Sequence, residues 1–507
     1  MKHRNLLVAG ALLLVALEPA KAEERIDMQA LHRMIEALRE ENAQMKEEMR
    51  SVRQALDDAR DEARAARDLA IDSRKHAPEV AAESELASGY PSQDLASRRT
   101  GGVNLRLLDL SLDVLTAAGW SNADDDELAL LQAGGHDPNQ RGFTLQQVEL
   151  SFQGAVDPYF RGETHLIYFV DADGESRFEL EEAFATTTRL PFGLESHGLE
   201  LEVGHFQTEF GRLNPRHPHQ WSWQDQPIVN ARFFGGDGMR APGLRAGWLL
   251  PVPWFAEVHV GVQNAKGETN PSFLANEDVF EERSIGGRPH ASSGVRASSD
   301  LVHLLRIVNG FDLGDELSTQ IGLSALFGPN ATGNDGSTRI FGADFVLKWL
   351  PIVSDRGWPF IVLEGEMMLR RYRADDFFGC PAGEEGACAA GDVPVFLEDD
   401  VLRDWGAYAQ LLWGFRRNWA MGLRGEWTGG RGPSFDAESG TFVDRDTDPF
   451  RSKRHRVSPL LVYHPTEFSR LRLQYNYDRD ASFAGEVAHS LWAGLEFSFG
   501  AHAAHAY

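Results

Sequence analysis

The segment Arg470-Leu-Arg-Leu-Gln-Tyr-Asn-Tyr-Asp478 decides how this chain folds. From Leu471 to Tyr477 every second residue is leucine or tyrosine, whereas the residues between them are charged or carry amides. A period of two is that of a β-strand with one apolar face and one polar face. Residues 490–499 repeat the alternation, with Leu491 and Leu495 on the apolar face. The C-terminal region therefore predicts strands whose two faces meet different environments.

About sixteen such runs occupy the chain from residue 103 to residue 500. Short turns alternate with long polar loops, which are 119–142, 209–240, 265–297, 375–402 and 431–455. An even strand number with loops sorted in this way is typical of barrels in the outer membrane of Gram-negative bacteria. Such a sheet must close on itself, because hydrocarbon offers no partner to an unpaired backbone N–H or C=O. We therefore predict that residues 101–507 form an all-β membrane barrel of about 16 antiparallel strands, with short periplasmic turns, long external loops and a water-filled lumen.

The composition excludes other classes of protein. The chain has 507 residues, of which 42% are hydrophobic, and its net charge is −26. Because negative charge repels phosphate backbones, we expect no nucleic-acid partner. After residue 22 the sequence holds no run of roughly 18 apolar residues, which excludes a membrane protein built from helices.

The N-terminus carries an export signal. A basic start is followed by an apolar stretch from Leu6 to Leu17 and by the small residues of Ala20-Lys-Ala22, which predicts a signal peptide over 1–22. An exported chain reaches an oxidising compartment, so we expect Cys380 and Cys388 to form a disulfide in their Gly-rich loop. Two unpaired thiols are the alternative.

Residues 23–75 have a helical period. From Met28 to Ala70 thirteen positions spaced alternately three and four apart are apolar, except for Asn42. A sustained heptad pattern predicts a coiled coil, and one polar core residue usually fixes its register and oligomeric state. We expect this coiled coil in the periplasm, where it could contact a partner; a lone solvated helix is the alternative. Residues 76–100 contain Pro, Gly and Ser and indicate a linker.

Three segments carry a family resemblance. They are Val148-Glu-Leu-Ser-Phe-Gln-Gly-Ala-Val-Asp-Pro158, Glu181-Glu-Ala183 and Val203-Gly-His-Phe-Gln-Thr-Glu-Phe-Gly211, and together they resemble the phosphate-selective porin O and P family. The segment Asn214-Pro-Arg-His-Pro-His-Gln-Trp221 resembles a loop of uncharacterised members of the wider group. The resemblance implies a sixteen-stranded homotrimeric porin in outer-membrane lipid, in some relatives with an N-terminal periplasmic coiled coil.

The strand pattern also yields candidate pore-lining residues. They lie on the polar faces of the expected strands and comprise Glu149, Glu200, Glu202, Glu364, Glu366, Arg370, Arg424, Glu426, Arg470, Arg472 and Glu496. A phosphate-selective constriction is expected to be lined with Arg and Lys. Because acidic and basic residues are mixed here, the sequence does not predict phosphate selectivity.

The third long loop, 209–240, is the candidate constriction loop. It is rich in Pro and aromatic residues, and its candidate site residues are His217, His219, Trp221, Trp223, Asp225 and Asp237. Imidazole and carboxylate suit transition-metal ions, so His217 and His219, with the two aspartates, could bind one. Histidines that are hydrogen-bonded within a packed loop are the alternative.

These features favour a porin through which ions or small hydrophilic solutes diffuse passively. An outer-membrane receptor or adhesin, including one linked to metal binding, is the alternative because long loops offer binding surface. No Ser-His-acid arrangement occurs at a recognisable spacing, so we expect neither enzymatic activity nor a cofactor. A plug-gated transporter would need more strands than roughly 400 residues provide.

Overall fold

The computed structural model describes residues 97–100, 103–106, 108–171, 174–291, 294–380, 388, 394–437, 439–483, 485 and 487–500. The predicted signal peptide over 1–22 and the predicted coiled coil over 23–75 lie outside these residues and stay predictions. Within the described part of the chain, no helix is both long and apolar enough to cross a membrane.

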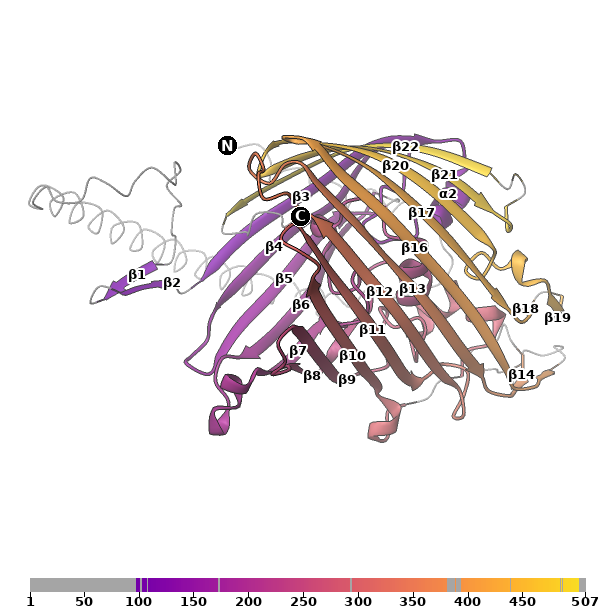
Figure 1. Ribbon diagram of the computed structural model, residues 1–507. Helices are drawn as coiled ribbons and strands as arrows, with labels where there is room; N and C mark the ends of the chain where they lie inside the picture. The colour runs from indigo at the N-terminus through magenta and orange to yellow at the C-terminus, as the bar shows by residue number, and fades with distance from the viewer. Residues whose placement is uncertain are drawn as a thin grey trace, which may run out of the picture. The chain divides into compact units, whose positions relative to one another are not determined.

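Sixteen antiparallel strands form a closed barrel (Figure 1). Each strand pairs with its neighbours along the chain, and the last strand pairs with the first over eleven residues, from Ser490 opposite Ser121 to Gly500 opposite Ser111. The predicted closed barrel is therefore confirmed. Its strands are β3 (Asp109–Ser121), β4 (Gly142–Ala155), β5 (Phe160–Val170), β6 (Ser176–Thr187), β7 (Leu199–Gln207), β8 (Arg240–Leu249), β9 (Phe255–Gln263), β10 (Val302–Asp312), β11 (Leu317–Pro329), β12 (Ser337–Trp349), β13 (Phe360–Ala374), β16 (Asp400–Arg416), β17 (Trp419–Arg431), β20 (Arg454–Thr466), β21 (Ser469–Asp480) and β22 (Val487–Gly500).

The start of the barrel differs from the prediction. The predicted strands begin at residue 103, but the first strand of the barrel, β3, begins at Asp109. Residues 97–100 and 103–106 instead form a separate two-stranded sheet of β1 (Ser97–Thr100) and β2 (Val103–Arg106), so the predicted boundary at residue 101 falls between its two strands. Residue types alternate from Val103 to Leu107 and again from Leu108 to Leu112, with a shift of one position between the two runs. Alternation indicates the faces of a strand but not the strand with which it pairs.

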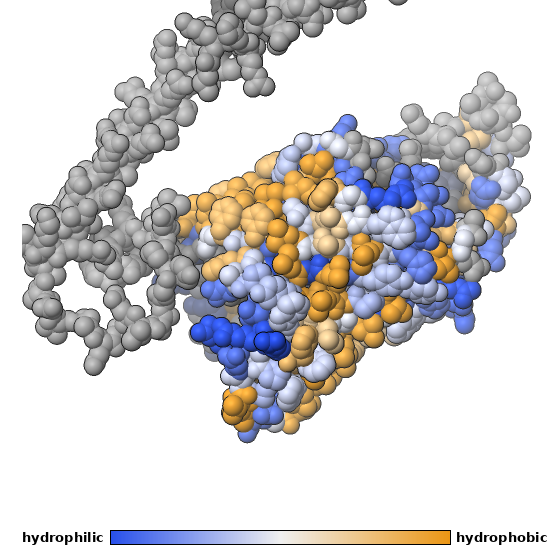
Figure 2. Space-filling view, turned by 90° about the horizontal axis from the view of Figure 1, so that it is seen from above, coloured by the Kyte–Doolittle hydropathy of each residue, from blue (hydrophilic) through white to orange (hydrophobic). Residues whose placement is uncertain are grey.

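Opposite faces of each strand meet different surroundings. In β21 the side chains of Leu471, Leu473 and Tyr475 are exposed on the outer wall. Arg472 and Gln474, which alternate with them, are buried inside the barrel. On the face shown in Figure 2, hydrophobic residues cover much of the strand wall among less hydrophobic ones, and hydrophilic residues gather at the right of the view. The outer wall thus has the polarity of a surface that contacts hydrocarbon.

Connections of different length separate the two ends of the barrel. One end has turns such as 156–159, 250–254, 313–316 and 417–418. The other end carries the long connections, some of which contain short helices or strand pairs: α2 (Asp125–Leu131), η3 (Pro218–Gln220), α3 (Ile228–Phe234), α4 (Glu277–Glu282), η4 (Ile285–Gly287), η5 (Ser298–Asp300), η7 (Arg445–Thr447), β14 (Phe377–Gly379) with β15 (Val395–Leu397), and β18 (Ser434–Asp436) with β19 (Thr441–Val443). On the short-turn side, η2 (Pro191–His197) joins β6 to β7. Cys380 and Cys388, between β14 and β15, form a disulfide.

The interior next to the long loops is packed with side chains. Helix α3 lies inside the barrel, where Val229, Phe233 and Phe234 join one buried cluster with inward residues of β10 to β13 and β16. In the adjacent loop 122–141, Leu128 and Leu131 of α2 pack against Trp492 of β22. The space left for the predicted water-filled lumen is therefore smaller than the strands alone would enclose, because loop residues occupy part of the cross-section.

Candidate functional site

Loop 208–239 crosses the inside of the barrel. It leaves β7 at Gln207 and enters β8 at Arg240, and it corresponds to the predicted constriction loop 209–240. Its base is closed by Asn214, whose side-chain amide donates to the carbonyls of Thr208 and Met239 at 2.7 and 3.0 Å. The two ends of the loop are thereby held together beside the wall from which it starts.

The loop is fixed first to the wall formed by β11 and β13. The guanidinium group of Arg212 pairs with Glu364, and its Nη1 donates to Gln320 at 3.3 Å. The backbone N–H of Arg212 donates to Glu366 at 2.6 Å. Because both glutamates project inward from β13, they hold the loop through its side chain and its backbone together.

Farther along, the loop reaches β17, β20 and β21. The indole N–H of Trp223 donates to the carbonyl of Ser458 at 3.0 Å. The backbone N–H of Gln224 donates to Gln474 at 2.8 Å, and that of Ile228 donates to Glu426 at 2.7 Å. The loop therefore crosses the inside of the barrel between separate parts of the wall.

Five arginines project inward from these three neighbouring strands, and we call them the arginine wall: Arg424, Arg454, Arg456, Arg470 and Arg472. Asp225 of the loop pairs with Arg424 and, at 3.0 Å, with Arg456. Burial alone raises the pKa of Asp225, but the two guanidinium groups more than offset it and hold that pKa below its usual range. Asp225 is therefore a charged anchor of the loop.

The remaining charges of the arginine wall are also neutralised by carboxylates. Arg470 and Arg472 pair with Glu496 at 2.5 and 3.0 Å. Arg454 and Arg456 pair with Asp478 at 2.7 and 2.8 Å. Since all five arginines are buried, the wall serves to hold the loop in this conformation rather than to present a row of exposed cations to a solute.

A second group, which we call the histidine cluster, lies on β4, β5, β6 and the loop. It consists of His165, His217, His219, Glu149, Glu181 and Glu182, all buried. His217 Nδ1 lies 2.8 Å from Glu181 Oε2, and its Nε2 lies 2.9 Å from Glu182 Oε2. His219 Nδ1 lies 2.9 Å from Glu149 Oε2. The loop is thus held on this side by imidazole–carboxylate contacts.

A β-bulge explains how two consecutive glutamates face the same histidine. Neighbouring residues of a strand normally point to opposite faces. In the pairing of β5 with β6, His165 opposes Glu182 while Leu166 opposes Leu180, so Glu181 is the extra residue. A bulge re-aims a side chain, and here both carboxylates enter the barrel.

The structure separates the predicted site residues by environment. One predicted pore-lining residue, Glu200, is exposed near the short-turn end. The others are buried inside the barrel: Glu149, Glu202, Glu364, Glu366, Arg370, Arg424, Glu426, Arg470, Arg472 and Glu496.

The predicted site residues of the loop have separate partners. Trp221 donates its indole N–H to the carbonyl of Arg216 at 3.0 Å. Asp237 lies 3.8 Å from His136. The two aspartates therefore take other partners than His217 and His219, and the four do not form one metal site.

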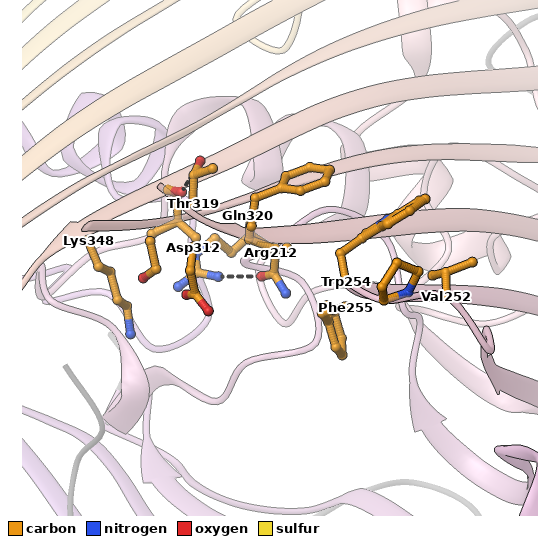
Figure 3. Close-up of a pocket in the computed structure, with 13 residues that line it drawn as sticks. Arg212, Val252, Trp254, Phe255, Asp312, Thr319, Gln320 and Lys348 are labelled. Carbon is orange, nitrogen blue, oxygen red and sulfur yellow. Dashed lines mark hydrogen bonds between the residues drawn. The ribbon is translucent and has the colours of Figure 1, made fainter. Parts of the chain in front are cut away.

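Open space remains toward the short-turn end. A cavity of about 660 Å³ is lined by turn 250–254, by β10 to β12 and by Arg212 (Figure 3). Its polar lining includes Asp312, Gln320 and Lys348. A smaller cavity of about 210 Å³ borders the histidine cluster, including Glu149, His165 and His217. Both cavities show that polar side chains line hollow space below the packed loop.

Sequence reasoning missed several of these residues. Arg454 and Arg456 were not among the predicted pore-lining residues, although the two repeat the spacing of Arg470 and Arg472. His165 lay within an expected strand, two residues after Glu163. The shared parity of such pairs was the available signal, because residues two apart on a strand face the same side.

Comparisons with known proteins do not give a family for this chain. No protein-family model matches the chain. An uncharacterised protein of Aquifex aeolicus strain VF5 is 28% identical over 397 residues, which cover 74% of each chain. Among solved structures, the outer membrane channel DcaP of Acinetobacter baumannii is 11% identical with a TM-score of 0.47 and covers 80% of this chain and 100% of its own. An anion-selective porin from Comamonas acidovorans is 11% identical with a TM-score of 0.44 and covers 77% and 99%. OprB of Pseudomonas putida is 12% identical with a TM-score of 0.45 and covers 78% and 94%.

Proposed function

We propose that the protein is an outer-membrane channel of the porin type, through which ions or small hydrophilic solutes diffuse passively. The observation that carries the proposal is loop 208–239, which is held across a closed sixteen-stranded barrel by charged contacts to separate walls. A barrel of this strand number encloses more space than its own side chains fill. The inward loop then sets the width of the passage.

The charges inside the barrel argue against a simple rule for selectivity. Arg212 and Lys348 border the larger cavity together with Asp312 (Figure 3). The arginine wall is buried against carboxylates, so it does not form the exposed basic ladder expected of phosphate selectivity. We therefore assign the channel to small hydrophilic solutes as a class.

Planar-bilayer recording tests this function directly. Purified full-length protein should insert in discrete conductance steps, and the steps should be small because buried loop residues occupy part of the cross-section. The reversal potential in a salt gradient measures the preference between cations and anions. Protein that inserts into liposomes but gives no conductance steps in planar bilayers would contradict the proposed channel function.

The outer wall yields a prediction about the membrane. Leu473 lies near the middle of β21 and is 46% exposed on the outer face. Replacing it by arginine should lower the free energy of unfolding from liposomes by about 2–4 kcal/mol, because a cation at mid-bilayer is poorly solvated. The matched control is Val487→Arg at the first residue of β22, where the expected loss is about 0–1 kcal/mol. Equal losses at the two positions would contradict a membrane-facing wall.

The proposed assembly is a homotrimer whose N-terminal segment lies in the periplasm. The heptads of residues 23–75 support this assignment, because a coiled coil joins helices of separate chains. The same segment is the part of the chain that is available to a periplasmic partner.

A further inference from the structure

The histidine cluster has a feature that loop anchoring alone does not require: three side chains of metal-ligand type lie close enough to share one ion. Glu149, His165 and His217 each offer one ligand atom, and these atoms all lie within 4.8 Å of one another. Glu149 Oε1 lies 3.0 Å from His165 Nδ1 and 3.5 Å from His217 Nδ1. Zinc bonds to nitrogen and oxygen near 2.0–2.2 Å, and a tetrahedral site with such bonds places its ligand atoms about 3.4 Å apart.

The Nε2 atom of each of these two histidines lies within hydrogen-bond distance of a carboxylate. His165 Nε2 lies 3.0 Å from Glu163 Oε1, and His217 Nε2 lies 2.9 Å from Glu182 Oε2. A metal-binding histidine typically donates its other ring N–H to a carboxylate, which fixes the tautomer and points the lone pair at the metal. The Nδ1 atoms of both histidines border the shared centre, where His165 Nδ1 also contacts Ser151 Oγ and His217 Nδ1 also contacts Glu181 Oε2, each at 2.8 Å. A bound ion would replace these two contacts.

The carboxylate of Glu149 is oriented in the same way. Its Oε1 faces the two Nδ1 atoms, while its Oε2 contacts His219 Nδ1 at 2.9 Å. Ser151 Oγ donates to Oε1 at 3.0 Å. A ligating carboxylate is usually supported by such outer hydrogen bonds. His219, which the sequence analysis placed in a metal site, thus supports a ligand.

The charge balance also distinguishes this cluster from the other anchors of the loop. Asp225, Glu364 and Glu496 pair with arginines. Glu149, Glu181 and Glu182 contact imidazoles instead, and imidazoles are neutral when they bind metal. A divalent cation at the centre would compensate these buried carboxylates.

We propose that Glu149, His165 and His217 bind a divalent transition-metal ion of the zinc class. Two imidazoles and one carboxylate are ligands that suit such ions. The bordering cavity of about 210 Å³ leaves room for a water molecule or a solute group at a further coordination position. The bound ion would tie the loop, through His217, to β4 and β5.

Metal titration of the purified full-length protein tests this proposal. After treatment with a chelator and dialysis, each chain should bind one Co²⁺ ion with visible d–d absorption, and Zn²⁺ should displace it. His165→Gln and His217→Gln should abolish this binding. Glu182→Gln, which leaves the three ligands in place, should weaken it by about 10–100-fold because the orientation of His217 is lost.

The matched control is His259→Gln in β9. His259 is also buried and lies 3.4 Å from Glu257, so this variant removes an imidazole–carboxylate pair elsewhere in the barrel. It should bind Co²⁺ as the unmodified chain does. Absence of binding, or equal binding by the control and both ligand variants, would overturn the proposal, as would loss of binding in all of them.

X-ray absorption of the zinc-loaded, unmodified protein gives a readout that needs no variant. The proposal expects scattering from two imidazole rings together with oxygen ligands. A zinc environment without imidazole would overturn it even if the variants failed to fold. Neither measurement depends on conductance, so the metal site and the channel function are tested separately.

Discussion

Replacing residues 215–236 by a short Gly-Ser linker should raise the single-channel conductance several-fold. These residues include α3 and the anchors Trp223 and Asp225, which occupy the inside of the barrel. Without them, the sixteen strands enclose an interior too wide for their own side chains to fill. Asn214 remains in place and still closes the base of the loop through its contacts with Thr208 and Met239. The measurement is the conductance step in planar bilayers at fixed salt.

Shortening the pair of strands β18 and β19 is the matched control. This pair belongs to the long connection 432–453, and Thr441 and Phe442 in it are exposed. Its removal should leave the conductance unchanged. A loop 208–239 variant that folds and conducts like the full-length protein would show that another part of the barrel limits the flow.

Asp225→Ala should release the loop from the arginine wall. The carboxylate of Asp225 pairs with Arg424 and Arg456 and accepts hydrogen bonds from Gln474 and Asn476, each at 2.7 Å. Breaking a buried ion pair from one side leaves charges without compensation, which typically destabilises a protein by 3–5 kcal/mol. Arg424 and Arg456 keep other carboxylate partners, so we expect about 3 kcal/mol. The measurements are the free energy of unfolding and the rate at which a protease cleaves the loop.

Asp237→Ala on the same loop is the control, since its side chain is 32% exposed and lies 3.8 Å from His136. The free energy of unfolding of this variant should fall by less than about 1 kcal/mol. The depressed pKa of Asp225 also fixes the pH window. A carboxylate with a lowered folded-state pKa stabilises fully above its unfolded value, near 3.9, and less as the pH falls through the folded value. Cleavage of the loop that is equal for the two variants at neutral pH would contradict the role of Asp225.

The barrel could be predicted because the residue pattern of each strand indicates which of its faces points outward. In β21 and β22 the residue types alternate over most of each strand, and the outer and inner faces follow from this parity. The lengths of the connections then distinguished the two ends of the barrel. The first strand was misplaced because both β2 and the start of β3 alternate in residue type, and alternation does not specify the pairing partner.

The site was harder to predict because its parts meet only in three dimensions. Asp225 and Arg456 are 231 residues apart, so no local pattern links them. The role of Glu181 depends on a bulge, which breaks the parity rule that identified the other inward residues. His217 was singled out from the His-Pro-His sequence, but its partners Glu149 and His165 come from strands on which they appear as ordinary polar positions.

The anchors of loop 208–239 also impose an order on assembly. Gln224 and its partner Gln474 are separated by 250 residues, and the barrel closes when the last strand pairs with β3. Contacts of such high contact order form late, because the entropy of closing the intervening chain must be offset first. The residues of β20 and β21 that contact the loop are not in place until these two strands have joined the sheet. A barrel caught before that moment would therefore be leakier than the finished one, and electrical resistance would be among the last properties the molecule acquires.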